Sequence, residues 1–391
     1  MKGLLLEAQW EPRKDYVPSE FEKTTRKVIT GSSVWRYPKM EVTTVEAPRP
    51  GPDDVVIRVK FCGVCGSDVH FYETDSDGYM LYPGLTRFPT ILGHEFSGVV
   101  EEVGKNVKDL KPGTPVTCEE MIWCGHCIPC RNGYPNHCVN LEEIGFTING
   151  AFADYIVIGA KYCWPVDALV ERYGNLEKAM QAAAFCEPTS VAYNGLFVRS
   201  GGFKPGAYVV VFGAGPIGLA AIALSRAAGA SRVVVFEVSE IRRKLAKALG
   251  ADAVYDPVEL NKQGTQPREV IAELTKGEGA DMLVEAAGAM SKTIPEMEAS
   301  LAINGKIVII GRAAERAPMY LENLQVRRSQ VFGAQGHSGH AIFPSVIRMM
   351  GAGLIDMTKA ITSVRPLDEA VDAIKYLSEH RSEGKIMVKI S

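Results

Sequence analysis

Four cysteines form the most specific chemical motif in this chain. Cys124, Cys127, Cys130 and Cys138 follow the spacing C-x2-C-x2-C-x7-C. Four thiolates at this spacing enclose one tetrahedral zinc ion and leave no coordination position for water. The motif therefore predicts a structural zinc site. Because such a site contributes its binding energy to folding, loss of Cys127 or Cys130 should destabilise the surrounding loop without changing the chemistry of the protein.

A second group of residues has the mixed ligand types of a catalytic zinc site. Cys65 supplies a thiolate, His94 supplies an imidazole, and Glu95 places a carboxylate directly beside that imidazole. Catalytic zinc sites use three protein ligands and keep one position open for water or substrate. Glu187 is our candidate for the third ligand, and Glu95 and Cys186 are the alternatives at that position.

The segment 213–218, Gly-Ala-Gly-Pro-Ile-Gly, fits the dinucleotide-binding pattern G-x-G-x-x-G. It follows a strand-like segment at 209–212 and opens an apolar helix, which is the context that the pattern requires. The first glycine permits a tight turn, the second lets a pyrophosphate approach the backbone, and the third allows close packing of helix and strand. The predicted cofactor-binding residues in this loop are Gly213, Gly215, Pro216, Ile217 and Gly218.

Glu237 ends the next strand-like segment, and it predicts which dinucleotide is bound. An acid at this position accepts hydrogen bonds from the adenosine ribose hydroxyls and repels a 2′-phosphate, so we expect NAD and not NADP. Arg242 and Arg243 follow in the next helix, where an arginine could pair with that phosphate or simply be solvated. We include Arg242 among the cofactor-binding candidates.

The two halves of the chain differ in pattern. Short strand-like segments separated by Pro and Gly clusters lie at 55–61, 97–103 and 152–158, and they predict a mostly β domain. From about residue 190, strand-like segments at 208–212, 232–236, 281–285 and 306–310 alternate with helical ones, which implies a parallel sheet. The chain ends with helical segments at 342–350 and 367–377 and a strand-like segment at 386–390. Segments 11–33 and 75–89 are predicted insertions, either parts of the substrate cleft or plain surface loops.

Length and composition exclude several classes of protein. The chain has 391 residues, enough for two domains, and its net charge of −3 predicts neither nucleic acid nor a membrane as a partner. Its odd count of nine cysteines favours a reducing cytosol over a disulfide framework. The first ten residues are too short and polar for a signal peptide, and the longest apolar stretch is broken by glycine and proline. We therefore expect a soluble, cytoplasmic protein.

The motifs follow the order found in the zinc-dependent medium-chain alcohol and polyol dehydrogenases, and the chain resembles that family along nearly its whole length. The matching segments are G-V-C-G-S-D-V-H at 63–70, G-H-E at 93–95, the four cysteines, E-P-T-S-V at 187–191 and G-A-G-P-I-G at 213–218. The carboxylate of Glu187 is similar to the sorbitol and threonine dehydrogenase branches, whereas the liver alcohol dehydrogenase branch has cysteine there. Further segments at 35–38, 78–86, 187–194 and 335–340 resemble the scyllo-inosose 3-dehydrogenases of inositol catabolism.

The resemblance implies an α/β fold with a GroES-like, mostly β catalytic domain and a Rossmann domain built on a doubly wound parallel sheet. Residues 1–189 would form the catalytic domain with both zinc sites, residues 190–333 the NAD-binding domain, and residues 334–391 a return to the catalytic domain.

The resemblance also implies roles for further residues. Zinc would act as a Lewis acid on the substrate hydroxyl, and a nicotinamide would receive the hydride. Ser67 would take the proton and pass it through the nicotinamide ribose to His70, which exchanges it with solvent. The segment 335–340 borders the substrate in the family, so Gln335, His337 and His340 are candidate substrate residues. A glycine-rich hinge is the alternative for that segment.

We therefore expect an NAD-dependent zinc oxidoreductase acting on a secondary alcohol of a cyclic polyol or keto-polyol. The alternatives within the family are an L-threonine 3-dehydrogenase-like enzyme and a sorbitol or butanediol dehydrogenase. A zinc-free quinone or alkene reductase would need neither zinc site, and a non-catalytic binding protein would tolerate replacement of Ser67. By analogy with the family, the chain is expected to form a homodimer or homotetramer.

Overall fold

The computed structural model describes residues 1–313 and 316–391, and within them the chain forms two compact units. The first unit contains Met1–Glu187, Ser363–Arg381 and Lys385–Ser391, and the second contains Pro188–Thr362 and Ser382–Gly384. The chain thus returns to the first unit at Ser363, later than the predicted return at residue 334.

Hydrogen bonds explain why residues after 334 stay with the second unit. The backbone N–H of Ala334 donates to the carbonyl of Ile309 at 2.9 Å, and the amide of Asn194 donates to the carbonyls of Gln335 and Gly336. These contacts hold the start of the segment to strands and helices of its own unit.

A sheet of seven strands forms the body of the first unit, and the pairs among β10, β6, β5, β3, β9 and β18 are antiparallel. Its order is β10-β6-β5-β3-β18-β17, and β9 also pairs with β3. The strands are β3 (Asp54–Gly63), β5 (Glu95–Val103), β6 (Pro115–Cys118), β9 (Tyr155–Gly159), β10 (Cys163–Pro165), β17 (Ile361–Pro366) and β18 (Lys385–Lys389). Valine, isoleucine and phenylalanine dominate β3 and are almost all buried, because such side chains pack well on a pleated surface.

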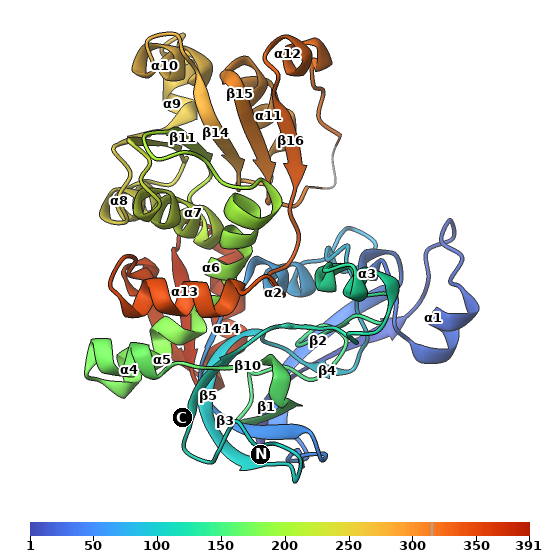
Figure 1. Cartoon of the computed structure of the whole chain (residues 1–391). Coiled ribbons are helices and arrows are strands. Elements are labelled where there is room, and N and C mark those ends of the chain that lie inside the picture. Colours follow the sequence, from blue (N-terminus) through green and yellow to red (C-terminus); the bar gives the residue numbers. More distant parts are fainter. Residues whose placement is uncertain (314–315) are drawn as a thin grey trace. The chain divides into compact units, whose positions relative to one another are not determined.

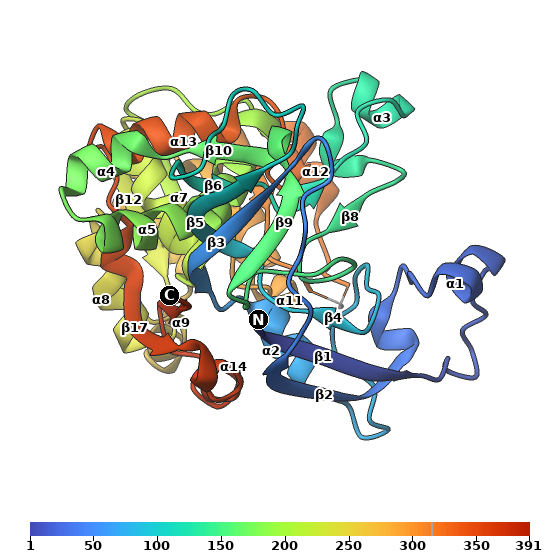
Figure 2. The same cartoon turned by 90° about the horizontal axis from the view of Figure 1, so that it is seen from below.

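A second, three-stranded sheet in this unit contains β1 (Lys2–Trp10), β2 (Trp35–Thr44) and β4 (Thr90–Ile91). The segment 11–33 joins β1 to β2 and carries the short helix α1 (Glu20–Thr25), which projects from the end of this ribbon (Figure 2). This segment pairs with the other predicted insertion through the bridge between Val28 and Thr86. The two insertions therefore support each other.

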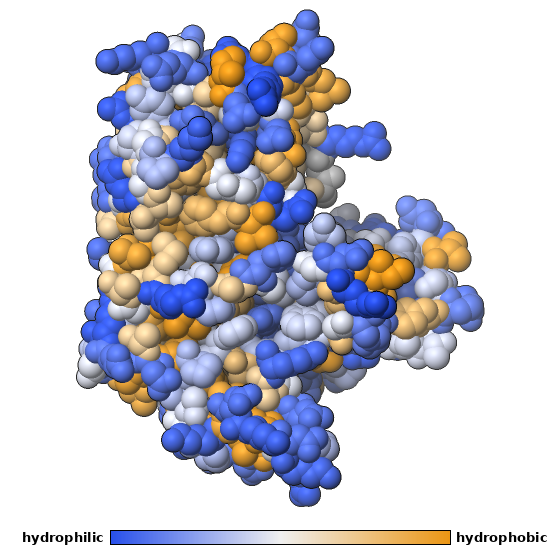
Figure 3. Space-filling view, in the orientation of Figure 1, coloured by the Kyte–Doolittle hydropathy of each residue, from blue (hydrophilic) through white to orange (hydrophobic). Residues whose placement is uncertain are grey.

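The four-cysteine segment forms a separate protrusion of the first unit, seen at α3 in Figure 1. Its elements are β7 (Met121–Ile122), α3 (Ile128–Arg131), the 3-10 turn Pro135–His137 and β8 (Glu142–Glu143). The side chains of Ile128 and Val139 are exposed, and Figure 3 shows apolar surface on this protrusion. So little apolar side chain is buried here that the protrusion needs another source of stability.

A parallel sheet of six strands forms the second unit, in the order β13-β12-β11-β14-β15-β16 (Figure 1). The strands are β11 (Tyr208–Phe212), β12 (Arg232–Phe236), β13 (Ala253–Tyr255), β14 (Ala280–Glu285), β15 (Leu301–Ile309) and β16 (Gln330–Gly333). The last four residues of both β11 and β12 are buried, as expected for a parallel sheet covered on both faces. The predicted fold class, a mostly β domain and a parallel-sheet Rossmann domain, is confirmed.

Helices complete each unit. The helices of the second unit are α7 (Pro216–Ala227), α8 (Glu240–Ala248), α9 (Pro257–Lys262), α10 (Pro267–Leu274), α11 (Met290–Ala299), α12 (Leu321–Val326) and α13 (Ile342–Gly351). Besides α1 and α3, the first unit has α2 (Gly66–Tyr72), α4 (Asp167–Tyr173), α5 (Leu176–Ala184) and α14 (Ala370–Glu379). The division between the units falls within α6 (Cys186–Tyr193), which continues into a π-helix at Asn194–Arg199. Among the described residues, no helix has the length and hydropathy needed to cross a bilayer.

Candidate active site and metal centres

Cys65, His94 and Glu95 meet in the first unit, where their ligand atoms all lie within 4.8 Å of one another. Cys65 precedes the first residue of α2, and Glu95 begins β5. His94 follows a turn at Gly93, whose φ of +93° and close approach to the backbone N of Phe152 leave no space for a Cβ atom. The turn therefore directs the imidazole and the carboxylate to the cysteine.

Glu95 has a charged partner that the sequence analysis missed. The Nζ of Lys385, on β18, donates to Oε1 of Glu95 at 2.8 Å and to the carbonyl of Val64 at 3.0 Å. Both side chains of this pair are almost fully buried. Burial alone would lower the pKa of Lys385, but the charge of Glu95 outweighs it and the pKa is raised. The Glu95 carboxylate is thus already neutralised by an ammonium group.

The ring of His94 lies among acidic groups. Burial works to lower its pKa, but the Cys65 thiol and the carboxylates of Asp68 and Glu187 together raise the pKa well above its ordinary value. Asp68 also accepts a hydrogen bond from the backbone N–H of Cys65 at 2.8 Å, and burial raises its own pKa to about 6. Such an accumulation of negative charge in a buried place favours a bound cation.

Three buried polar atoms at this site have no hydrogen-bond partner among the described residues: Oγ of Ser67, Oδ1 of Asp68 and Nδ1 of His94. Leaving a buried polar atom unpaired costs free energy, so these atoms indicate groups that bind here. A thiolate, an imidazole and carboxylates are the donors that catalytic zinc uses. The residues present therefore fit a zinc ion, and the buried hydroxyl of Ser67, two residues after Cys65, has no hydrogen-bond partner of its own among the described residues.

The other predicted ligand candidates lie nearby. Glu187 is buried near the start of α6 and its charge acts on His94, although the close set of three ligand atoms does not include it. Cys186 is buried, burial raises the pKa of its thiol, and the thiol points to the carbonyl of Ala182 at 3.8 Å. A thiol engaged with the last turn of α5 is a poor alternative to a carboxylate as ligand.

His70 lies one turn after Ser67 on α2, and 41% of its side chain is exposed, whereas His94, Glu95 and Glu187 are buried. Its Nδ1 lies 3.5 Å from Oε2 of Glu73, a residue that the sequence analysis did not select. The spacing of three residues on a helix was a signal that could have found Glu73.

The sulfur atoms of Cys124, Cys127, Cys130 and Cys138 also lie within 4.8 Å of one another. A backbone N–H of His126 lowers the pKa of Cys124 to about 5, and a backbone N–H of Cys130 lowers that of Cys127. Burial raises the pKa of Cys130 and Cys138, so the match to a zinc ion rests on four sulfur atoms at ligand spacing and not on the pKa values. This group fits a closed, structural zinc.

The glycine loop of the second unit has the geometry that its pattern predicts. Gly213 has φ +90°, and a Cβ atom there would lie 2.7 Å from Cα of Ala287. A Cβ on Gly218 would lie 2.0 Å from the carbonyl oxygen of Gly213. Gly215 is the residue before α7. A Cβ atom on Gly215 would have Nη1 of Arg242 as its nearest neighbour, at 3.9 Å, so the loop leaves space at this position. Pro216 and Ile217 form the first turn of α7.

Glu237 is buried and holds the glycine loop. Its Oε2 accepts a hydrogen bond from the backbone N–H of Ala214 at 2.6 Å, and its Oε1 accepts one from Ser239 at 2.8 Å. Arg242 donates through Nε to the carbonyl of Glu383 at 2.8 Å. Arg243 binds the carboxylate of Asp256 at 2.9 Å, so it is anchored in place and is not a freely solvated helix residue.

Gln335, His337 and His340 do not form one cluster. His337 is buried with its ring edge on Phe343, at 5.2 Å between ring centres, whereas Gln335 and His340 are exposed. His340 and Ala341 both have positive φ, of 52° and 54°, immediately before α13. This geometry suits the hinge alternative at least as well as a substrate-binding segment.

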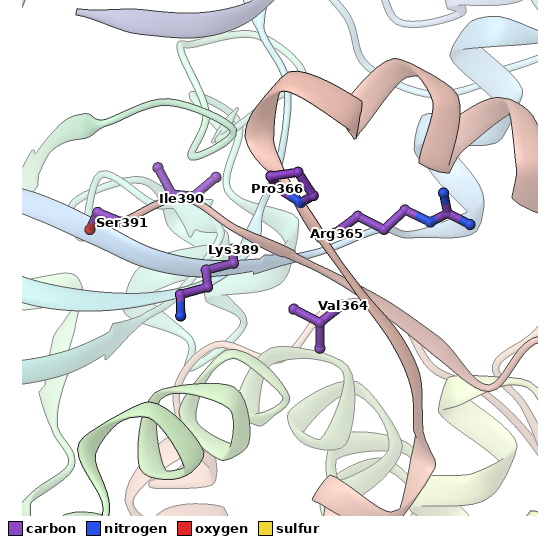
Figure 4. Close-up of a pocket in the computed structure, with 6 residues that line it drawn as sticks. All are labelled: Val364, Arg365, Pro366, Lys389, Ile390 and Ser391. Atoms are coloured by element: carbon purple, nitrogen blue, oxygen red, sulfur yellow. The ribbon is translucent and has the colours of Figure 1, made fainter.

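A surface hollow of about 380 Å³ lies between β17 and β18 (Figure 4). Its lining residues are Val364, Arg365, Pro366, Lys389, Ile390 and Ser391. Lys389 is paired with Glu177 and Arg365 with Glu369. None of the predicted site residues lines this hollow, so it is separate from the candidate active site.

Comparison with protein families gives two matches. Residues 51–168 match the alcohol dehydrogenase GroES-like domain, and residues 216–352 match the zinc-binding dehydrogenase family. The chain is 45% identical to scyllo-inosose 3-dehydrogenase of Thermotoga maritima, with 99% of each chain covered. It is 33% identical to L-threonine 3-dehydrogenase of Bacillus subtilis over 84% of this chain and 89% of that enzyme.

Solved structures are similar along the chain as well. A Thermotoga maritima structure assigned to the alcohol dehydrogenases has 45% identity and a TM-score of 0.95, with 99% of each chain covered. A structure assigned to the zinc-binding dehydrogenases from Sinorhizobium meliloti, bound to NADP, has 28% identity and a TM-score of 0.76, and covers 93% of this chain and 98% of its own.

Proposed function

Because this chain belongs to the zinc-binding alcohol dehydrogenases, we propose that it oxidises a secondary alcohol of a cyclic polyol or keto-polyol with NAD as hydride acceptor. The observation that carries this proposal is the meeting of Cys65, His94 and Glu95 in one acidic, buried place beside the unpaired hydroxyl of Ser67. No such place is needed by a zinc-free reductase or a binding protein.

We assign Cys65, His94 and Glu187 as the residues that hold the catalytic zinc. Glu187 is preferred over Glu95 because the ammonium group of Lys385 already neutralises Glu95. A zinc ion in such a site supplies Lewis acidity, which makes an alcohol oxygen easier to deprotonate. The four cysteines hold the second, structural zinc in the protrusion around α3.

The proton route uses residues of α2. The Ser67 hydroxyl accepts the proton of the alcohol, and His70, whose side chain is more exposed, releases it to solvent. An imidazole suits this last step because it exchanges protons near neutral pH. The chain's own contribution is thus to place a buried hydroxyl at the substrate and a half-buried imidazole one helical turn away.

NAD is proposed as the cofactor on the basis of Glu237. The loop 213–218 has the turn, the close approach and the helix start that a pyrophosphate needs. The buried carboxylate of Glu237 disfavours a 2′-phosphate beside it. Since a related structure binds NADP, steady-state rates with NAD and NADP should be compared directly, and we expect a preference for NAD.

The substrate class rests on the 45% identity, over 99% of both chains, to an enzyme named for scyllo-inosose. L-Threonine is the second candidate, supported by the 33% identity to L-threonine 3-dehydrogenase. NADH formation should be measured with scyllo-inosose, myo-inositol, sorbitol, L-threonine and 2,3-butanediol. We expect the highest kcat/KM with an inositol derivative, and a response confined to threonine would refute the polyol proposal.

A homodimer or homotetramer and a cytoplasmic location stay predictions from the family resemblance. Light scattering of the purified protein measures the first, and fractionation of cells measures the second.

A further inference from the structure

Glu73 ends the helix that carries Ser67 and His70. Its backbone N–H donates to the carbonyl of Val69 at 2.8 Å, and its Oε2 lies 3.5 Å from Nδ1 of His70. The N–H of Leu81 binds the carbonyls of both His70 and Glu73, at 3.0 and 3.1 Å. The last turn of α2 is therefore fixed, and it holds the carboxylate against the imidazole.

The Glu73 carboxylate is itself held from α14, a segment far away in sequence. Ser378 donates its hydroxyl to Oε1 at 2.9 Å, and Nη2 of Arg381 donates to both carboxylate oxygens at 2.6 Å. Burial would raise the pKa of Glu73, but the bonds from Arg381 and Ser378 and the charges of Arg381 and His70 outweigh it and lower the pKa. The group is thus an ionised carboxylate with a defined orientation.

A carboxylate beside one imidazole nitrogen selects the tautomer. Glu73 lies at ion-pair distance from Nδ1, 3.5 Å, and its negative charge favours the proton on that nitrogen, which leaves Nε2 as the base. This is the arrangement by which a carboxylate orients a catalytic histidine in other enzymes. The charged groups that face His70 are Glu73 on its own helix and Arg381 after α14, which acts through Glu73.

We propose that Glu73, clamped by Arg381 and Ser378, is a positioning residue that fixes the orientation and tautomer of His70 so that Nε2 receives the substrate proton. This inference rests on the proposed function, in which His70 releases the proton. It adds a residue to the proton route and gives α14 a role in it.

The test uses Glu73→Gln in the zinc-loaded enzyme, with Glu379→Gln as the matched control, because Glu379 is an exposed acid on α14. The rate of the first turnover of NADH formation should fall about tenfold in Glu73→Gln, a size typical of residues that orient a ligand or base. It should be unchanged in Glu379→Gln, and substrate KM should be unchanged in both. Circular dichroism and zinc content check that each variant is folded.

A pH profile separates positioning from a purely structural role. Without the carboxylate, protonated His70 loses a stabilising charge, so its pKa falls, and the rise of the first-turnover rate with pH should move to lower pH in Glu73→Gln. Arg381→Ala removes a positive charge that neutralises Glu73, so protonated His70 is stabilised and the rise of the rate should move the opposite way, to higher pH. An unchanged profile and rate in a folded Glu73→Gln would overturn the inference.

His70→Ala distinguishes failure of the inference from failure of the proposed function. If His70→Ala turns over at the wild-type rate, the proposed proton route itself is wrong. If His70→Ala is slow and is rescued by added imidazole, while Glu73→Gln is as fast as the unaltered enzyme, only the role of Glu73 is refuted.

Discussion

At the residue scale, Lys385 and Lys389 offer a direct comparison between a buried and an exposed lysine on one strand, β18. Lys385 is buried against Glu95, whereas Lys389 binds Glu177 with about half of both side chains exposed. Removing one partner of a buried ion pair leaves an uncompensated charge, while an exposed pair contributes little.

We therefore expect Lys385→Ala to lower the free energy of unfolding by about 3–5 kcal/mol, and Lys389→Ala to lower it by at most about 1 kcal/mol. Urea unfolding of the zinc-loaded proteins measures both. Equal effects of the two substitutions would show that Glu95 does not depend on Lys385, and would reopen Glu95 as the third zinc ligand.

At the scale of the element, substitution of two glycines at the start of α7 by alanine should have different effects on stability. A Cβ on Gly218 would lie 2.0 Å from a backbone oxygen, so Gly218→Ala forces the loop to move and should cost about 1–3 kcal/mol of stability. A Cβ on Gly215 meets only the end of an arginine side chain at 3.9 Å, so Gly215→Ala should change stability by no more than about 0.5 kcal/mol.

The two variants should differ in cofactor binding as well. In Gly215→Ala the new methyl group lies where the pyrophosphate approaches the backbone, so NAD affinity should fall at least about tenfold in a folded protein. Calorimetric titration with NAD measures the affinity and thermal unfolding measures the stability. Wild-type affinity in Gly215→Ala would remove this loop from the proposed cofactor site.

The protrusion around α3 is the second element with a prediction of its own. Because it buries few apolar side chains, its order depends on the sulfur atoms and the metal that they would hold. Cys127→Ser should therefore lose one zinc per chain and lower the unfolding temperature, while the protein that is still folded keeps its kcat. Elemental analysis, thermal unfolding and kinetics test this. Loss of kcat at unchanged stability would contradict a structural role.

At the scale of the whole molecule, the two proposed metal sites differ in access. A site with an open position lets a bidentate chelator attack the metal, whereas four thiolates leave no position for it. Treatment with 1,10-phenanthroline should remove one zinc per chain first, abolish NADH formation, and leave far-UV circular dichroism unchanged. Added zinc should restore the activity. Full activity after loss of one zinc would show that the reaction does not use that metal.

The whole molecule also shows how far prediction from the sequence reached. The predicted strands at 208–212 and 232–236 agree with β11 and β12, and the predicted helix at 342–350 agrees with α13 to within one residue. Strong hydrophobic patterns bounded by glycine define such elements locally. The boundary near residue 334 was less well placed, because backbone bonds to Ile309 and side-chain bonds from Asn194 decide to which unit the next residues belong.

The sequence by itself determined the features whose residues lie close together in the chain: the four-cysteine motif and the glycine loop. Their geometry follows from local turns and helix starts, so spacing alone predicts it. Only the tertiary structure decided which distant charges act on these groups. Lys385 lies 290 residues from Glu95, and Arg381 lies 308 residues from Glu73. Such pairs arise from strand pairing and helix packing, and no local pattern encodes them.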